Sequence, residues 1–315
     1  MDHSIQRALL IAGPTASGKS AIAITLARRF GGMVINADSM QVYADLRVLS
    51  ARPDDAELTQ APHALYGHVD GAQNYSTGFW LADVAAAISQ AQARGLLPII
   101  IGGTGLYFKA LTQGLSQIPP VPEGVRAAMR LSAQGLSPQA LHARLSACDP
   151  VMAVKLRPSD PQRILRALEV FAATGQSLAY FQGARTAPLL PAAIGLFLAP
   201  ARDALLASID ARFDTMLSLG ALEEVRALAA RGLDPALPVM RAHGVPHLAA
   251  SLRGDIGLAE AGHRAKADTR AYAKRQLTFA RHQLPQLHWC APADAVKATT
   301  TMLNAARAEK TSGRM

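Results

Sequence analysis

Residues 13–20 read Gly13-Pro14-Thr15-Ala16-Ser17-Gly18-Lys19-Ser20, which fits the pattern G-x-x-x-x-G-K-[ST]. An apolar run at 8–12, typical of a buried parallel strand, precedes this stretch, and a helical pattern at 20–30 follows it. The glycines let the backbone curl so that successive N–H groups converge on phosphate oxygens. A Gly/Ser-rich turn that arose by chance would not need a strand before it and a helix after it. The stretch therefore predicts a phosphate-binding P-loop.

Each part of this loop has an expected task. The first turn of the following helix adds its partial positive charge to the site. Lys19 would place its ammonium on the terminal phosphate, and the Ser20 hydroxyl would coordinate Mg²⁺. The pattern does not say which phosphate compound is bound, or whether a phosphoryl group is transferred or the phosphate only leaves.

The chain on either side of the loop predicts an α/β fold. Further buried-strand patterns occur at 33–37 and 97–101, and a helical pattern at 77–94 lies between them. Strands that alternate with helices indicate a doubly wound parallel sheet of the P-loop NTPase-like kind. A proline-rich linker follows Leu115, no strand-like run occurs up to about Pro188, and an apolar strand returns at 194–198. We therefore expect a core of residues 1–117 and 191–315, with a helical C-terminal part, and a helical insertion at 118–190.

The composition of the chain indicates which class of partner it binds and which compartment it occupies. The chain has 315 residues and a formal net charge of +9, which suggests a polyanionic partner, either nucleic acid or an anionic membrane surface. Its two cysteines, Cys148 and Cys290, are too few for a disulfide framework and fit a reducing cytoplasm. The apolar run at 8–12 is too short for a signal peptide or a membrane span. We expect a cytoplasmic protein.

Two segments should meet the P-loop at the carboxyl ends of the strands, where ligands bind in such sheets. Asp38 follows the second strand and is a candidate general base or Mg²⁺ ligand; an Asp-Ser helix cap is the alternative. Residues 102–105 follow the third apolar strand, and Thr104 offers a hydroxyl there; an ordinary strand-to-helix turn explains them equally well. No apolar strand ends in Asp-Glu or Asp-Asp, which weakens the case for phosphoryl transfer.

Two basic stretches are candidates for contact with phosphate backbones. Residues 263–281 contain six Lys or Arg and one acidic residue on a probable helix, with Lys266, Arg270, Lys274 and Arg281 in one stripe. A solvated charged face is the ordinary explanation, but the shortage of acidic partners at i,i+4 favours binding of a nucleic-acid backbone. A second basic face, formed by Arg163 and Arg166, lies in the expected insertion.

Taken together, the motifs resemble those of one family, the tRNA dimethylallyltransferases. The resemblance rests on six segments in order along the chain: 13–20; Asp38-Ser39-Met40-Gln41-Val42-Tyr43; Gly102-Gly103-Thr104-Gly105-Leu106-Tyr107; Asp160-Pro161-Gln162-Arg163-Ile164-Leu165-Arg166-Ala167-Leu168-Glu169; Arg212-Phe213 with Met216, Gly220 and Glu224-Val225; and Lys274-Arg275-Gln276-Leu277-Thr278.

The resemblance implies a P-loop core that holds dimethylallyl diphosphate and Mg²⁺, and an insertion that embraces the anticodon stem-loop of tRNA. The dimethylallyl group would go to N6 of adenine 37, and diphosphate would leave. By this resemblance Asp38 is the general base, Thr104 orients it, and Arg212 neutralises charge on the diphosphate. The residues that it assigns to tRNA binding are Asp38, Ser39, Met40, Gln41, Thr104, Arg126, Gln162, Arg163, Ile164, Leu165, Arg166, Arg241, Lys274, Arg275, Gln276 and Arg281.

Two segments depart from the family pattern. The family usually reads Gly-Thr-Ala-Lys-Pro where this chain has Leu-Ser-Ala-Arg-Pro at 49–53, and Val-Gly-Tyr-Arg-Gln where it has His-Gly-Val-Pro-His at 243–247. The second departure loses an Arg and a Tyr expected near the tRNA, and Pro246 also lacks a backbone donor. Affinity or substrate choice is in question at these positions.

Three alternatives to tRNA prenylation remain at this point. The first is prenylation of a free adenine nucleotide, the second is an ATP-dependent small-molecule kinase, and the third is a tRNA-binding protein without activity. The insertion and the basic C-terminal helix argue against the first, because a free nucleotide needs neither. Nothing in the sequence demands more than a monomer.

Overall fold

The computed structural model describes residues 8–312, with the side chains of 307–312 left aside. It divides into two compact units, one formed by the chain up to Thr112 together with the chain from Leu189 onward, and the other by Gln113–Pro188. Sequence analysis placed the borders of the insertion at 118 and 190.

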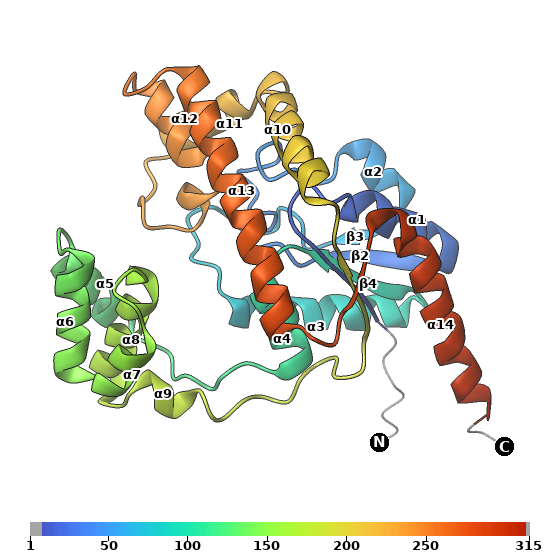
Figure 1. The fold of residues 1–315 in the computed structure, drawn as a ribbon, viewed down its shortest axis with the longest axis horizontal. Coiled ribbons are helices and arrows are strands. Elements are labelled where there is room, and N and C mark those ends of the chain that lie inside the picture. The colour runs from blue at the N-terminus through green and yellow to red at the C-terminus, as the bar shows by residue number, and fades with distance from the viewer. Residues whose placement is uncertain (1–7, 313–315) are drawn as a thin grey trace. The chain divides into compact units, whose positions relative to one another are not determined.

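A six-stranded parallel sheet forms the centre of the first unit (Figure 1). Its strand order is β3-β2-β4-β1-β5-β6, so the chain crosses over repeatedly. The strands are β1 (Leu9–Ala12), β2 (Gly32–Asn36), β3 (His63–Ala64), β4 (Leu97–Gly102), β5 (Ile194–Leu198) and β6 (His288–Cys290). The expected α/β parallel sheet is confirmed, and the edge strands β3 and β6 are additions. Their two and three residues are too short to show a strand pattern in the sequence.

Alternating residues of the strands face two apolar layers, as the period of a strand requires. Leu10 of β1 packs in one layer with α3 (Thr77–Ala93), α4 (Gly105–Gln113) and the end of α13 (Leu258–Gln283). Leu9 and Ile11 pack in the other layer with α1 (Lys19–Phe30) and α14 (Ala295–Ser312). The remaining elements of this unit are α2 (Asp55–Gln60), α10 (Arg202–Ser218), α11 (Ala221–Ala230), η1 (Val239–Arg241), α12 (Val245–Leu252) and η2 (Pro292–Asp294).

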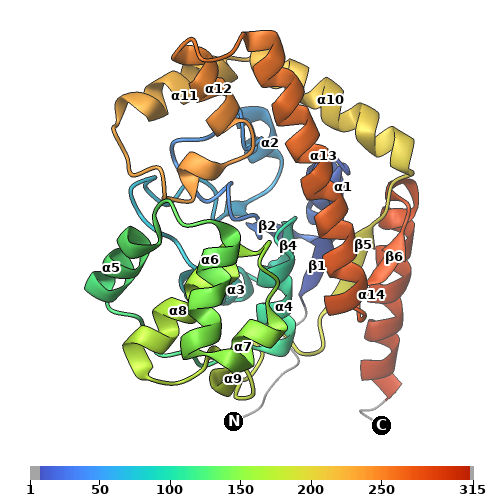
Figure 2. The ribbon, with the colours of Figure 1, turned by 60° about the vertical axis from the view of Figure 1, so that its left-hand side comes forward.

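A third apolar cluster joins α10, α11, α12 and the first half of α13 to the chain after β2. In Figures 1 and 2, α13 runs as one long helix from these helices to the sheet, with α10 beside it. The same helix therefore takes part in three apolar clusters, one of which it forms with Leu205 and Ile209 of α10. That position lets it reach the carboxyl ends of the strands.

The second unit is helical, and its own apolar core includes Leu145, Ile164 and Val170. Its helices, drawn in green in Figure 2, are α5 (Glu123–Ala133), α6 (Pro138–Cys148), α7 (Pro150–Lys155), α8 (Pro161–Thr174) and α9 (Leu178–Phe181). Three of them begin with proline directly after a capping side chain, because proline suits the first helical position, where no N–H bond is needed. Pro138, Pro150 and Pro161 therefore mark helix starts.

Candidate active site

The segment between β1 and α1 forms the expected phosphate loop. Gly18, directly before α1, has a left-handed backbone with φ of 81°, and no side chain caps the helix. A Cβ on Gly13 would lie 3.0 Å from the Ser17 hydroxyl, so a larger residue would crowd this turn. Ala16 also has a positive φ, of 61°. The curled loop leaves the first N–H groups of α1 free to receive an anion.

Lys19 lies within this loop. Its Nζ donates hydrogen bonds to the carbonyl oxygens of Gly13 (3.0 Å) and Pro14 (2.6 Å). Burial lowers the pKa of the Lys19 ammonium to about 7, against the opposing effect of the Asp38 carboxylate. An anion bound in the loop would favour the charged form, so Lys19 is prepared to gain charge together with its ligand.

A cavity of about 770 Å³ brings the predicted groups together. The phosphate loop forms one side, Asp38 lies at the end of β2, and Arg212 reaches in from α10. Lys19 and Asp38 therefore share one cavity. Burial lowers the pKa of the Arg212 guanidinium, and Asp38 opposes that shift. Arg212 forms no ion pair with the acidic side chains that the structure describes, so its charge is available to an anionic ligand.

Asp38 is held by the turn that follows β2. Its Oδ1 accepts a hydrogen bond from the backbone N–H of Met40 (2.9 Å), and its own N–H donates to Oδ1 of Asn36 (2.8 Å). No helix follows, so the alternative interpretation of Asp38 as a helix cap is wrong. The second carboxylate oxygen has no hydrogen bond from the side chains and backbone described here. That oxygen is suited to accept a proton.

Thr104 contacts the neighbour of Asp38 rather than Asp38 itself. Its hydroxyl accepts a hydrogen bond from the Ser39 N–H (2.9 Å) and donates one to the Ser39 hydroxyl (3.2 Å). The expectation that Thr104 orients the base is thus corrected in its geometry, because Thr104 fixes the turn on which Asp38 sits.

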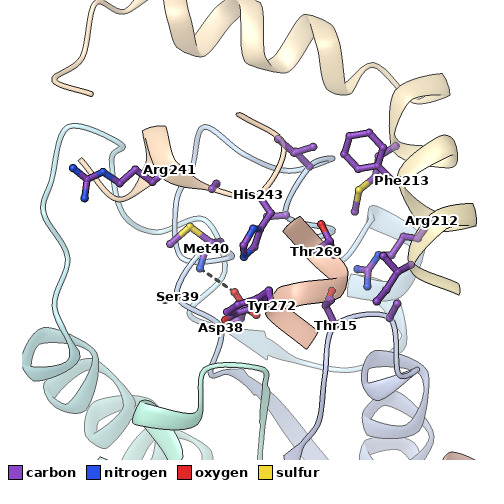
Figure 3. Close-up of a pocket in the computed structure, with 16 residues that line it drawn as sticks. Thr15, Asp38, Ser39, Met40, Arg212, Phe213, Arg241, His243, Thr269 and Tyr272 are labelled. Carbon is purple, nitrogen blue, oxygen red and sulfur yellow. Dashed lines mark hydrogen bonds between the residues drawn. The ribbon is translucent and has the colours of Figure 1, made fainter. Parts of the chain in front are cut away.

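A smaller cavity of about 200 Å³ adjoins the same residues and has mostly apolar walls (Figure 3). Leu49, Ile209, Phe213 and Met216 supply much of the wall. Asp38 also lines this cavity. The arrangement places a small apolar compartment directly beside a carboxylate.

Two aromatic side chains that sequence analysis did not assign close this compartment. His243 and Tyr272 line it together, with ring centroids 4.5 Å apart. Burial lowers the pKa of the His243 imidazole, and the nearby Arg275 lowers it further. Burial also raises the pKa of the Tyr272 hydroxyl, as does the Asp38 carboxylate. Both rings are therefore neutral near pH 7 and offer planar faces rather than charge.

The departure at 49–53 belongs to a loop that lines both cavities. Leu49 and Ser50 face the smaller cavity, and Ser50 and Arg52 face the larger one. Glu224 of α11 anchors this loop, since its carboxylate accepts backbone hydrogen bonds from residues 47, 48 and 49 at 2.5, 2.9 and 2.8 Å. Sequence analysis noted Glu224 only as part of a motif, because no local signal links it to a loop so far away in the chain.

At Pro246 the second departure is structurally mild. Pro246 lies in the first turn of α12, where a backbone N–H has no partner within the helix. Its missing donor therefore costs the helix nothing.

The basic stripe of α13 is corrected in part. Lys266 forms an ion pair with Asp214 (2.6 Å), and Arg270 forms one with Asp210 (2.6 Å), so α10 neutralises these two cations. Their acidic partners lie on α10 and not on α13, so the sequence of α13 alone could not show these ion pairs.

Within the part of the chain that the structure describes, two other basic residues of α13 are free of acidic partners. Lys274 is exposed and has no acidic partner among the described side chains, and Arg275 is exposed and lies over the Tyr272 ring at 5.6 Å.

Three residues expected to bind tRNA have other roles in the structure. Gln276 is only 7% exposed and hydrogen-bonds two backbone segments of the core. Ile164 is fully buried in the core of the helical unit. Gln41 donates both its side-chain hydrogen bonds to the backbone of the loop at residues 50 and 51. The side chains of Gln276 and Ile164 are buried and the Gln41 amide nitrogen already donates within the protein, and contact of these three residues with tRNA stays a prediction.

The other expected tRNA contacts are on accessible or partly accessible positions. Ser39, Met40 and Arg241 line the smaller cavity, and Arg281 lies over the Trp289 ring. In the helical unit Gln162 and Leu165 are not buried, and the three arginines there pair with nearby acids: Arg126 with Glu123, Arg163 with Asp160 and Arg166 with Glu169. These assignments stay predictions.

Comparison with known proteins identifies relatives of the whole chain. A family model described as IPP transferase matches residues 41–283. The tRNA dimethylallyltransferase of Beijerinckia indica subsp. indica is 63% identical over 91% of this chain and 96% of its own length. That of Methylocella silvestris is 61% identical over the same shares.

Solved structures agree with these relatives. The tRNA isopentenylpyrophosphate transferase of Bacillus halodurans superimposes with a TM-score of 0.70 at 29% identity, covering 98% of this chain and 99% of that one. A eukaryotic dimethylallyltransferase acting on tRNA gives a TM-score of 0.75 at 28% identity, covering 91% and 74%. Within residues 8–312, none of the helices is long and apolar enough to cross a membrane.

Proposed function

The chain belongs to the IPP transferase family and is a tRNA-prenylating enzyme, and from this premise we propose how its residues perform the transfer. The donor is dimethylallyl diphosphate, the acceptor is N6 of adenine 37 in tRNA, and diphosphate is released. One observation carries the proposal: the carboxylate of Asp38 lies on the same cavity as Lys19 and Arg212, with an apolar compartment beside it. The relatives favour tRNA over a free adenine nucleotide, the first alternative left by the sequence.

The diphosphate of the donor occupies the phosphate loop. Backbone N–H groups at the start of α1, the Lys19 ammonium and the Arg212 guanidinium surround it, and they stabilise the charge that grows as the C–O bond breaks. Mg²⁺, when bound, adds positive charge to the leaving diphosphate. The Ser20 hydroxyl lines this cavity and suits the ion, whereas no cluster of three His, Cys, Asp or Glu occurs in the described part of the chain.

The five-carbon group occupies the apolar compartment, next to Asp38. There the amine nitrogen of adenine attacks the allylic carbon, so a C–N bond forms while the C–O bond to diphosphate breaks. The free oxygen of Asp38 takes the proton that the nitrogen loses. An exocyclic adenine amine is a poor nucleophile, so alignment in a closed compartment contributes to the rate. A base in the anticodon loop can leave its stack at modest cost to reach the site.

We further propose that Lys274, Arg275 and the basic residues of the helical unit contact the tRNA backbone. We also propose that the protein acts as a monomer. Two cysteines, both half-buried and unpaired, fit the reducing cytoplasm where tRNA is modified.

The test is to incubate the protein with dimethylallyl diphosphate, Mg²⁺ and unmodified tRNA, and to weigh the anticodon fragment by mass spectrometry. A prenyl-sized gain on adenine 37 is the expected result. Modification of AMP alone, consumption of ATP with a phosphorylated product, or tRNA binding without any product would each overturn the proposal in favour of one of the three alternatives.

A further inference from the structure

The buried side chain of Gln276 connects the phosphate loop to the segment that follows β4, beside Asp38. Its Oε1 accepts a hydrogen bond from the Thr15 N–H in the phosphate loop (3.0 Å). Its Nε2 donates one to the Gly103 carbonyl, in the segment after β4 (2.8 Å). The amide group offers a donor and an acceptor at one end of a long side chain without carrying charge. A single side chain of α13 therefore joins two segments that belong to different strands.

The second of these segments supports the proposed base. A Cβ placed on Gly103 would lie 2.2 Å from Nε2 of Gln276 and 3.4 Å from Oδ2 of Asp38. Because Gly103 has no side chain, the amide and the carboxylate can both approach its backbone closely. The next residue, Thr104, holds the turn of Asp38 through Ser39. A displacement of this backbone would reach the carboxylate directly.

We propose that Gln276 is a positioning residue that sets the separation between the phosphate loop and the base, and so aligns the leaving group with the amine. The proposal rests on the proposed function and deepens it. Its physical basis is that transfer needs both reacting ends in one geometry, and a misplacement of about 1 Å costs roughly a hundredfold in rate. Gln276 is 7% exposed, so water does not replace its hydrogen bonds easily. The side chain touches neither reacting atom and acts through the two backbones.

Gln276→Met tests the idea, because methionine keeps the length and the packing of the side chain and removes both hydrogen bonds. We expect affinity for inorganic diphosphate, measured by titration calorimetry, to fall about tenfold, the effect of losing roughly one net hydrogen bond at the loop. We expect kcat for prenyl transfer at saturating donor to fall by a further tenfold or more. Amide hydrogen exchange should become faster in residues 13–20 and in 102–105, and stay unchanged in β5.

Leu303→Ala is the matched control. Leu303 is 5% exposed on α14, which packs on the other face of the sheet, so its truncation lowers stability without touching either loop. We expect this control to lower the melting temperature while diphosphate affinity and kcat stay within about twofold of wild type. Gln276→Met with wild-type affinity and kcat, or with losses no larger than those of the control at equal melting temperature, would overturn the proposal.

A failure of the Gln276 proposal can be distinguished from a failure of the proposed function. If the wild-type protein fails to prenylate tRNA, the mass assay reports it. Diphosphate affinity and exchange in residues 13–20 then still decide whether Gln276 organises the loop.

Discussion

The salt dependence of tRNA binding should distinguish free from neutralised cations on the single helix α13. Lys274 and Arg275 have no acidic partners among the described side chains, whereas Lys266 and Arg270 are paired with acids of α10. Each phosphate contact lowers the slope of log K against log salt concentration by about 0.9. Replacing Lys274 and Arg275 with Ala should therefore flatten the slope by about 1.8. Between 50 and 200 mM salt, wild type should lose about twelvefold more affinity than this variant.

The matched variant replaces Lys266 and Arg270 with Ala. These cations already neutralise carboxylates, so their loss should leave the slope within about half a unit of wild type. Filter binding of unmodified tRNA at four or five salt concentrations gives both slopes, and circular dichroism checks that each variant is folded. Equal slopes for wild type and the Lys274/Arg275 variant would show that this helix face does not bind the phosphate backbone.

Three further predictions concern the site. Asp38→Asn should lower single-turnover prenyl transfer by about a hundredfold or more while tRNA affinity stays within about twofold; a near-wild-type rate would remove Asp38 as the base. Glu224→Gln should raise the KM for the donor about tenfold, because the amide nitrogen would face backbone donors at 47–49 and would loosen the loop that lines both cavities. An unchanged KM would show that the contacts of Glu224 do not influence donor binding. Binding of inorganic diphosphate at pH 8 should take up close to one proton, because the pKa of Lys19 lies near 7 in the free protein and rises beside the anion, and the uptake should vanish at pH 6. Calorimetry in buffers of different ionisation enthalpy measures it, with Lys19→Arg, which is always protonated, as the baseline.

The local patterns of the chain were sufficient for much of the core. The apolar run before residue 13, the glycines of the loop and the helical pattern at 20–30 each act within a few residues, and β1 and α1 formed where the sequence indicated. The position of Asp38 near Lys19 followed from a general property of parallel sheets, whose carboxyl ends meet at one edge.

What the sequence could not supply was the set of contacts between distant segments. Gln276 bonds to a residue 261 positions away, and Glu224 to one 177 positions away. Neither contact can be recognised from the neighbouring sequence, because an amide or a carboxylate on a helix is common. The pairing of Lys266 and Arg270 with α10 escaped for the same reason, since helix periodicity describes one helix and not its neighbour.

The way the chain leaves and re-enters the α/β unit has a practical consequence. The N–H of Leu190 donates to the Leu111 carbonyl at 3.0 Å, so the points where the chain leaves and re-enters the α/β unit are adjacent. A few glycines and serines between them would replace the whole helical insertion at little entropic cost. A miniature transferase of this design would retain the phosphate loop, Asp38, Arg212 and Gln276. Hydrolysis of the donor, or transfer to small acceptors, could then be measured separately from RNA binding.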